Sequence, residues 1–269
     1  MLELSLLFMA AGKSSRYGGE PKMLAKIGPN KETLFEISFQ QIIKHINVKH
    51  IHLVLNEDNA LNILKEVKEV RYKYDLEFDL TSNIQEIPRF RKKPWGTGEA
   101  AASAWSYMKG PFLLLNSDDL YDEKTFELIN KECDENNNYI IGYELGKTLK
   151  NNKKANRGFI EEKDDMVRVL REKLNIEKSY YNETELKNIF VSVNLFLLQP
   201  PILMCLLELS ENFKKENDFN LIEEALLPDF INTIINRDQM KLYLIKSNGQ
   251  WNGITFKSDI AQIKKEINI

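Results

Sequence analysis

Cysteine and histidine are both scarce in this chain. Among its 269 residues there are two cysteines and three histidines. Cys133 and Cys205 have no metal-binding spacing, and two isolated thiols are typical of a reducing compartment rather than of a secreted disulfide scaffold. The histidines, His45, His50 and His52, match no metalloprotease signature, so packing or surface roles are favoured over catalysis. Chemistry that depends on a Ser–His–Asp or Cys–His pair is therefore disfavoured.

The chain also lacks a strong charge excess and long apolar runs. Its 37 Lys and Arg and 40 Asp and Glu give a formal net charge of -3, whereas dedicated nucleic-acid binders usually have a strong basic excess. The first residues have no basic segment of the kind that begins a signal peptide. The apolar run from Pro200 to Leu209 is about half the length that spans a bilayer. We expect a soluble cytoplasmic protein that has neither nucleic acid nor a membrane as a partner.

Apolar residues are nevertheless abundant enough for a large core. The chain is 43% hydrophobic and 10% aromatic, which excludes wholesale disorder. Its first half alternates expected elements: buried strands at 4–9, 51–55, 76–80 and 111–116, amphipathic helices at 34–46, 59–70, 98–107 and 123–135, and a loop at 86–95. This alternation predicts an α/β fold with a mostly parallel sheet that is covered by helices.

The second half of the chain has a different pattern. Shorter strands are expected at 139–144, 158–161, 167–170 and 190–198, then helices within 220–236, a strand at 241–245 and a helix from Ser258. No linker separates independent units, so we expect a single domain, 1–269, made of a first half (1–145) and a less regular second half (146–269).

The segment that follows the first strand is rich in small residues: Ala10-Ala11-Gly12-Lys13-Ser14-Ser15-Arg16. It is not a P-loop, because that motif needs a second glycine where Leu7 stands. A turn of this kind still suits phosphate binding, since backbone N–H groups can approach an anion and Arg16 can pair with its oxygens. An ordinary turn between a strand and a helix fits the same local pattern.

A second glycine-containing segment is Gly96-Thr97-Gly98-Glu99-Ala100-Ala101. It matches the weak dinucleotide-binding fingerprint, but that fingerprint must follow a buried strand. Here the preceding segment is a basic loop, so we reject this interpretation. What remains is a helix start with exposed N–H groups and no bulky side chains, which is suited to a flat base or an anion.

Two adjacent acids, Asp118 and Asp119, follow the very apolar strand that is expected at 111–116. Ligands of open α/β sheets bind at the carboxyl edge where such a strand ends. Carboxylates there suit Mg²⁺, which takes one or two protein carboxylates together with substrate phosphates. A capped turn before the helix that begins at Glu123 would equally favour aspartate.

Together these segments resemble the nucleotidyltransferases that join a nucleoside triphosphate to a phosphorylated sugar or alcohol. Those enzymes open with a strand, an Ala-Ala-Gly loop that ends in arginine, and Pro-Lys-x-Leu, which here is Pro21-Lys22-Met23-Leu24. The resemblance covers nearly the whole chain and weakens after about residue 145. It is closer to a largely uncharacterised branch of the family that carries Arg-Tyr-Gly-Gly, Lys-Lys-Pro-Trp-Gly-Thr-Gly and Asn-x-Asp-Asp together.

The resemblance implies a Rossmann-like nucleotide-diphospho-sugar transferase fold with a central mixed sheet, and in-line transfer of a nucleotidyl group with release of pyrophosphate. It implies that Arg16 holds the triphosphate, that Lys22 neutralises charge at the α-phosphate, and that Asp118 binds Mg²⁺. The implied nucleotide-binding residues are Ala10, Ala11, Gly12, Gln85, Gly96 and Thr97, of which the last three read the base. The implied acceptor-binding residues are Gly158, Lys173 and Asn194.

The chain departs from the family pattern near its end. Many relatives have a second metal-binding aspartate at the position that is Gly253 here, while Asp259 is expected to cap the last helix. Either Asn252 substitutes weakly, or Asp119 helps, or one metal site is altered. A glycosyltransferase that uses a nucleotide sugar and a non-catalytic nucleotide-binding module are the alternative functions. The sequence leaves the base, the acceptor and the oligomeric state open.

Overall fold

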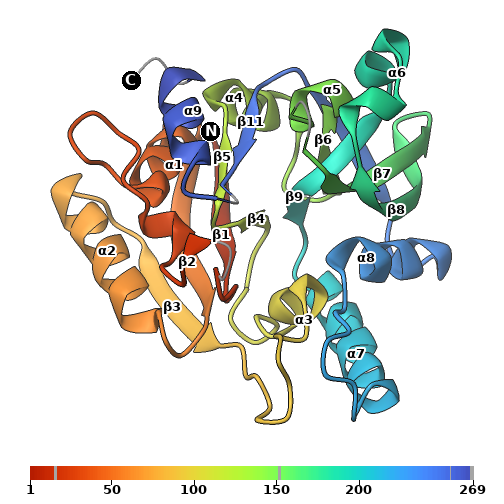
Figure 1. The fold of residues 1–269 in the computed structure, drawn as a ribbon, viewed down its shortest axis with the longest axis horizontal. Helices are drawn as coiled ribbons and strands as arrows, with labels where there is room; N and C mark the ends of the chain where they lie inside the picture. The colour runs from red at the N-terminus through yellow and green to blue at the C-terminus, as the bar shows by residue number, and fades with distance from the viewer. Residues whose placement is uncertain (15–16, 151–152, 255, 267–269) are drawn as a thin grey trace.

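The computed structural model describes residues 1–14, 17–150, 153–254 and 256–266. Within this part of the chain, a nine-stranded sheet has the strand order β3-β2-β1-β4-β9-β6-β10-β8-β7 (Figure 1). The strands are β1 (Leu2–Ala10), β2 (Ile46–Leu55), β3 (Asp79–Ile84), β4 (Phe112–Asn116), β6 (Asn138–Glu144), β7 (Ala155–Lys163), β8 (Met166–Ile176), β9 (Phe190–Leu198) and β10 (Leu242–Ser247).

The sheet is mixed, as expected. Strands β3, β2, β1 and β4 are parallel, and so are β6 and β10. Strand β9 is antiparallel to β4 and to β6, and the hairpin β7–β8 is antiparallel at the far edge. Parallel pairing therefore predominates in the first half of the chain, and antiparallel pairing in the second.

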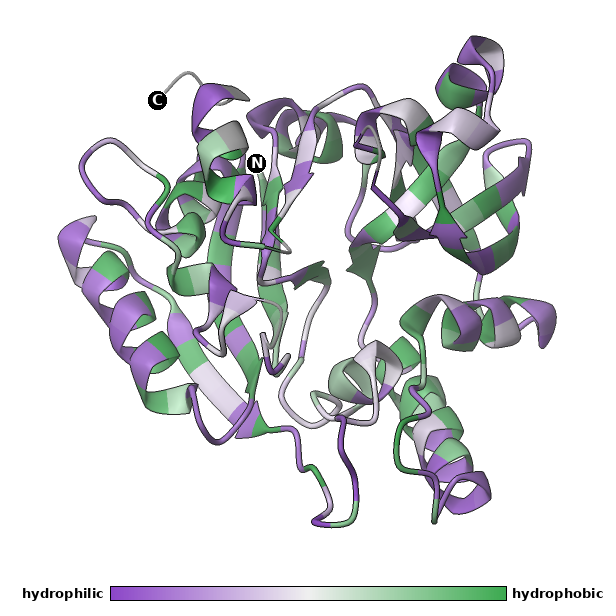
Figure 2. Ribbon diagram, in the orientation of Figure 1, coloured by the Kyte–Doolittle hydropathy of each residue, from purple (hydrophilic) through white to green (hydrophobic). Residues whose placement is uncertain are grey.

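Helices cover both faces of the sheet, which explains why the first strand is a continuous apolar run. The helices are α1 (Leu34–Ile43), α2 (Ala60–Lys73), α3 (Thr97–Ala102), α4 (Glu123–Glu132), α5 (Leu145–Thr148), α6 (Glu183–Asn188), α7 (Pro201–Glu216), α8 (Leu227–Asn236) and α9 (Asp259–Glu266), with short 3₁₀ turns η2 (Lys22–Leu24) and η3 (Lys178–Tyr180). Phe8 of β1 packs with α1 and α2, whereas Leu7 packs with α3, α7 and α8. The central strands are accordingly mostly green in Figure 2.

Most expected elements are present, but several limits differ. The strand expected at 76–80 lies at β3 instead, because Leu76 is held in the turn that follows α2, where its N–H donates to the Arg71 carbonyl at 3.0 Å. Helix α3 is shorter than expected. Helix α7 was not predicted as a helix, although Leu203 and Leu206 are buried along one side of it.

A small second sheet pairs β5 (Asp119–Tyr121) with β11 (Trp251–Gly253). Three-residue strands are too short to show a periodic pattern, so neither was predicted. The pairing brings a segment close to the C-terminus directly beside the end of β4.

Within the described residues, no helix is both long enough and apolar enough to cross a membrane.

Candidate active site

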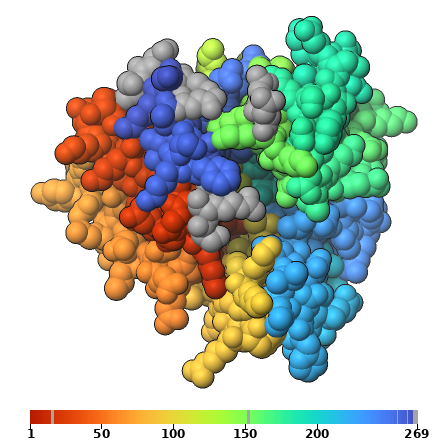
Figure 3. Space-filling view, in the orientation of Figure 1, coloured from red at the N-terminus to blue at the C-terminus, as the bar shows by residue number. Residues whose placement is uncertain are grey.

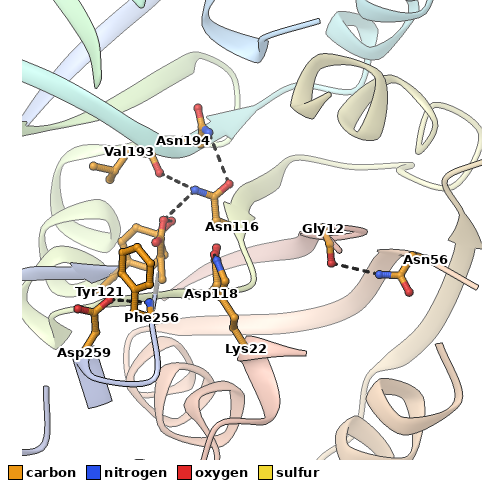
Figure 4. A network of polar contacts seen from close by, with 11 residues as sticks. Gly12, Lys22, Asn56, Asn116, Asp118, Tyr121, Val193, Asn194, Phe256 and Asp259 are labelled. Atoms are coloured by element: carbon orange, nitrogen blue, oxygen red, sulfur yellow. Dashed lines mark hydrogen bonds and ion pairs between the residues drawn. The ribbon is translucent and has the colours of Figure 1, made fainter. Parts of the chain in front are cut away.

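The carboxyl end of the parallel strands brings together two segments that are 96 residues apart. Met9 of β1 and Asn116 of β4 are register partners, so the segments that follow them leave the sheet at one edge. Lys22 in η2 and Asp118 after β4 meet there, with Lys22 Nζ 2.7 Å from Asp118 Oδ2 (Figure 4). The side chains are 18% and 33% exposed, respectively, so both remain accessible to a ligand.

The backbone of the segment after β1 is hydrogen-bonded to the side chain of an asparagine. Asn56, just after β2, donates its side-chain N–H groups to the carbonyl oxygens of Ala11 (3.3 Å) and Gly12 (3.2 Å). Apart from its two neighbours in the chain, no described residue has an atom within 4 Å of the place where a Cβ on Gly12 would stand. Sequence reasoning missed Asn56, whose only signal is its position at a strand end. Arg16 lies outside the described residues, and its role stays a prediction.

Asp119 lies in a different environment from Asp118. It is 5% exposed, and its Oδ2 accepts hydrogen bonds from Asn116 Nδ2 (2.8 Å) and Tyr121 Oη (3.2 Å). Burial, together with the neighbouring Asp118 carboxylate, raises the pKa of Asp119 to about 7. The two adjacent acids therefore differ in solvent accessibility. Asp118 is half-buried beside Lys22, whereas Asp119 belongs to a buried polar cluster.

The position without the expected second aspartate lies directly opposite Asp119. Gly253 and Asp119 are cross-strand partners of β11 and β5. A Cβ at Gly253 would lie 2.8 Å from the Trp251 ring and 3.0 Å from Asp119 Oδ1. The Asp119 carboxylate therefore lies close to where a side chain from position 253 would project. Asp259 lies in the first turn of α9, where it accepts the Phe256 N–H at 2.9 Å.

The fit of these residues to Mg²⁺ follows from their oxygen donors. No group of three or more Asp, Glu, His or Cys side chains that could hold a metal occurs in the described parts of the chain. Mg²⁺ requires fewer, since one or two carboxylates and the oxygens of bound phosphates suffice. Asp118 meets that requirement because it is accessible, whereas the carboxylate of Asp119 is already hydrogen-bonded in the core.

Gln85 is hydrogen-bonded to the Gly96–Thr97 segment. Gln85 Nε2 donates to the Gly96 carbonyl at 3.0 Å. Gly96 has φ +111°, and a Cβ there would lie 2.4 Å from the Ala225 carbonyl oxygen, so glycine is required by packing. The Thr97 hydroxyl accepts the Leu227 N–H at 3.0 Å, which ties this segment to the start of α8.

The residues expected at the acceptor side lie on three paired strands, β7, β8 and β9. Asn194 of β9 has φ +62°, a strained conformation for asparagine, and its Nδ2 lies 3.5 Å from Asn116 Oδ1. It therefore lies beside the Asp118–Asp119 turn. Lys173 of β8 instead extends over the ring of Phe159, 3.9 Å from its centroid. Gly158 of β7 packs closely against β8 and β9.

Sequence reasoning missed a half-buried arginine close to this region. The guanidinium of Arg157 lies over the ring of Trp251, 4.5 Å from its centroid, and donates to the Thr148 carbonyl at 2.5 Å. Burial lowers the pKa of Arg157 to about 10 even though Asp119 and Glu172 oppose the shift. Burial likewise raises the pKa of Glu172 to about 7, against the effect of Arg157. These charged groups lie on the side of the site that is expected to bind the acceptor.

The basic loop at 86–95 is attached to the molecule through Arg91. This side chain is 5% exposed, lies 3.7 Å from the Trp95 ring centroid and donates to the Asn220 carbonyl at 2.5 Å and to the Glu223 carbonyl. Figure 3 shows the yellow residues that include this loop packed beside the blue α7. Arg91, in the middle of the loop, therefore points into the fold rather than into solvent.

No protein-family model and no curated protein sequence matches this chain. Solved structures match over its full length. They include an inositol-1-phosphate CTP transferase from T. maritima (13% identity, TM-score 0.66, covering 100% of this chain and 96% of that one). Another is a UDP-glucose pyrophosphorylase complexed with UDP-glucose (14% identity, TM-score 0.65, covering 100% of this chain and 99% of that one). A third is a CTP:phosphocholine cytidylyltransferase from Streptococcus pneumoniae (12% identity, TM-score 0.62, covering 99% of this chain and 100% of that one).

These structural neighbours are nucleotidyltransferases. The chain therefore has the α/β nucleotide-diphospho-sugar transferase fold that its motifs predict, with a central mixed sheet flanked by helices. At 12–14% identity, the likeness shows the fold that this chain shares with them.

Proposed function

We propose that this protein is a Mg²⁺-dependent nucleotidyltransferase that joins a nucleoside triphosphate to a sugar phosphate or a related phosphorylated acceptor and releases pyrophosphate. The observation that carries the proposal is the contact between Lys22 and Asp118 at the carboxyl edge of the sheet. A cation and an accessible carboxylate placed side by side suit a reaction in which phosphate charge must be neutralised. The motif that contains Lys22 and the fold of the neighbours support the same reaction.

The roles of the chain's own groups follow from this arrangement. Backbone N–H groups of Ala10, Ala11 and Gly12 approach the triphosphate, and Lys22 donates to an oxygen of the α-phosphate. Asp118 would hold Mg²⁺, which supplies further positive charge to the phosphate oxygens when bound. No protein nucleophile is required, since an acceptor phosphate oxygen attacks the α-phosphorus in line and the protein supplies position and charge.

Base and acceptor are recognised on opposite sides of that centre. On the base side we propose Gln85, Gly96 and Thr97, which share one hydrogen-bonded segment. On the acceptor side we propose Asn194, Gly158 and Lys173. Asn194 is the best placed of these, since Asn116 links it to β4, the strand that ends just before Asp118.

The test is pyrophosphate release by the purified protein with Mg²⁺, for each nucleoside triphosphate against a pool of sugar and alcohol phosphates. Release with one triphosphate, lost in Asp118→Asn, establishes nucleotidyl transfer and identifies the base. Triphosphate binding without release across the whole panel contradicts the proposal and favours a non-catalytic nucleotide-binding module.

A further inference from the structure

A buried hydrogen-bond network joins Gln85 to α3 and α7. Gln85 Nε2 donates to two groups, the Gly96 carbonyl at 3.0 Å and Glu99 Oε2 at 2.5 Å. A carbonyl and a carboxylate both only accept hydrogen bonds, so the atom that faces them must be the amide nitrogen. Both amide N–H groups of Gln85 are thereby used inside the fold, and its carbonyl oxygen has no hydrogen-bond partner among the described residues.

Glu99 is itself held by a cation. Its side chain is 9% exposed, and Lys214 Nζ of α7 lies 3.1 Å from Glu99 Oε1. Lys214 also lies 3.2 Å from Glu211 Oε1. Burial alone lowers the pKa of Lys214, but the two carboxylates outweigh it and the net shift is upward. The Lys214 ammonium therefore contacts one oxygen of the Glu99 carboxylate, and the Gln85 amide donates to the other.

We infer that Glu99 and Lys214 are positioning residues that hold the Gln85 amide in one orientation, so that Gln85 presents only its carbonyl oxygen to the nucleobase. The inference rests on the proposed function, in which Gln85 reads the base. The reverse orientation would place the Gln85 oxygen against the Glu99 carboxylate and leave buried acceptors unpaired. The protein then prefers a nucleobase that has an N–H donor at the ring position that faces the Gln85 carbonyl oxygen.

Two pairs of nucleobases can be compared to test whether Gln85 selects the base through its carbonyl oxygen. Uracil and cytosine present opposite hydrogen-bonding groups at ring positions 3 and 4, and guanine and adenine do so at positions 1 and 6. A fixed acceptor therefore discriminates within each pair, whichever of the two positions it faces. Leaving an acceptor opposite another acceptor typically costs at least tenfold in binding.

The experiment measures the dissociation constants of UTP, CTP, GTP and ATP with Mg²⁺ by calorimetry. We expect wild type to prefer one member of a pair by tenfold or more. Glu99→Gln should reduce this ratio at least fivefold or invert it, because Lys214 attracts the oxygen of the new amide and turns its NH₂ group toward Gln85. Lys214→Met should also reduce the ratio.

Two variants are the controls. Lys214→Arg keeps the cation and should keep the wild-type ratio. Lys215→Met makes the same change of charge at a neighbouring exposed residue on α7 that has no ion pair in the described structure. Both lysines line a pocket of about 660 Å³, so neither substitution removes a core side chain.

The outcomes separate this inference from the proposed function. Unchanged ratios in folded Glu99→Gln and Lys214→Met, with tight binding by wild type, overturn the positioning role alone. Wild type that binds no nucleotide overturns the proposed function. A nucleotide-free readout is the ¹⁵N NMR spectrum, in which the Gln85 NH₂ protons should be protected from exchange in wild type and lose this protection in Glu99→Gln. Unprotected protons in wild type overturn the inference directly.

Discussion

Lys22 and Asp118 form the contact on which the proposed chemistry depends. Each was singled out from a local motif, because Pro-Lys-x-Leu and a strand that ends in Asp-Asp are visible in the sequence. Their contact was not visible, since a separation of 96 residues carries no local signal. Asn56, Arg157 and the Glu99–Lys214 pair were missed for the same reason: each is defined by what it touches across the fold.

Lys22→Ala should reduce turnover a hundredfold or more, or about 3 kcal/mol in activation free energy, because a charge at the reacting phosphate is lost. Its thermal stability should change little, since partly exposed ion pairs contribute little to folding. The measurement is the kcat for pyrophosphate release, with the exposed Lys26→Ala as the control. Near-wild-type turnover in Lys22→Ala would contradict the assigned role.

Gly253→Asp tests whether an acid can be placed at the position where the family resemblance implies a second aspartate. The new side chain would meet the Trp251 ring and Asp119, so we expect a loss of about 1–3 kcal/mol in unfolding free energy without a gain in activity. Gly110→Asp is the control, because among the described residues, its chain neighbours aside, none has an atom within 4 Å of its Cβ position. Urea denaturation of both variants checks the prediction, and equal stabilities would refute it.

At the scale of elements, the strands and helices with strong patterns were predicted and the irregular ones were not. Strand β1 and helix α1 bury nearly all of their apolar positions, and such runs are visible without a structure. The β5–β11 pairing was invisible because cross-strand pairing, not periodicity, makes those residues strands. The placement of the basic loop at 86–95 was equally undetermined.

Arg91→Met should loosen that loop. The substitution removes hydrogen bonds to carbonyl oxygens of residues 220 and 223 and the contact with Trp95, so the loop loses several of its contacts with the rest of the molecule. We expect hydrogen–deuterium exchange at 88–95 to rise at least tenfold relative to wild type. Arg89→Met alters an exposed residue of the same loop and should leave exchange unchanged. Equal exchange in the two variants would show that Arg91 is not the anchor.

At the scale of the whole molecule, buried histidine makes folding depend on pH. His52 is fully buried, stacks on Tyr107 and bonds Thr81 and Asn83 through its two ring nitrogens. Burial lowers its pKa from 6.5 to about 4, although the Asn83 hydrogen bond opposes the shift. Below about pH 6.5, His52 therefore becomes protonated in the unfolded chain but stays neutral in the folded protein. The free energy of unfolding consequently falls as the pH falls.

When the pH falls from 7.5 to 5, the protonation of His52 in the unfolded chain should lower the free energy of unfolding by about 2 kcal/mol. His52→Gln should be less stable than wild type at pH 7.5 yet lose about 2 kcal/mol less over the same interval. Chemical denaturation at both pH values, for wild type and variant, checks the difference. Identical losses in the two proteins would show that His52 does not titrate as its burial requires.

The sequence by itself determined the α/β class, the order of the main elements and the segments that carry the candidate chemistry, because apolar periodicity and short motifs are local properties. The tertiary structure alone decided which motif residues meet, which of the two aspartates stays accessible and how Gln85 is oriented. These features depend on contacts between residues far apart in the chain. Such contacts exist only once the sheet has formed and its packing has determined which polar groups are buried and what they bind.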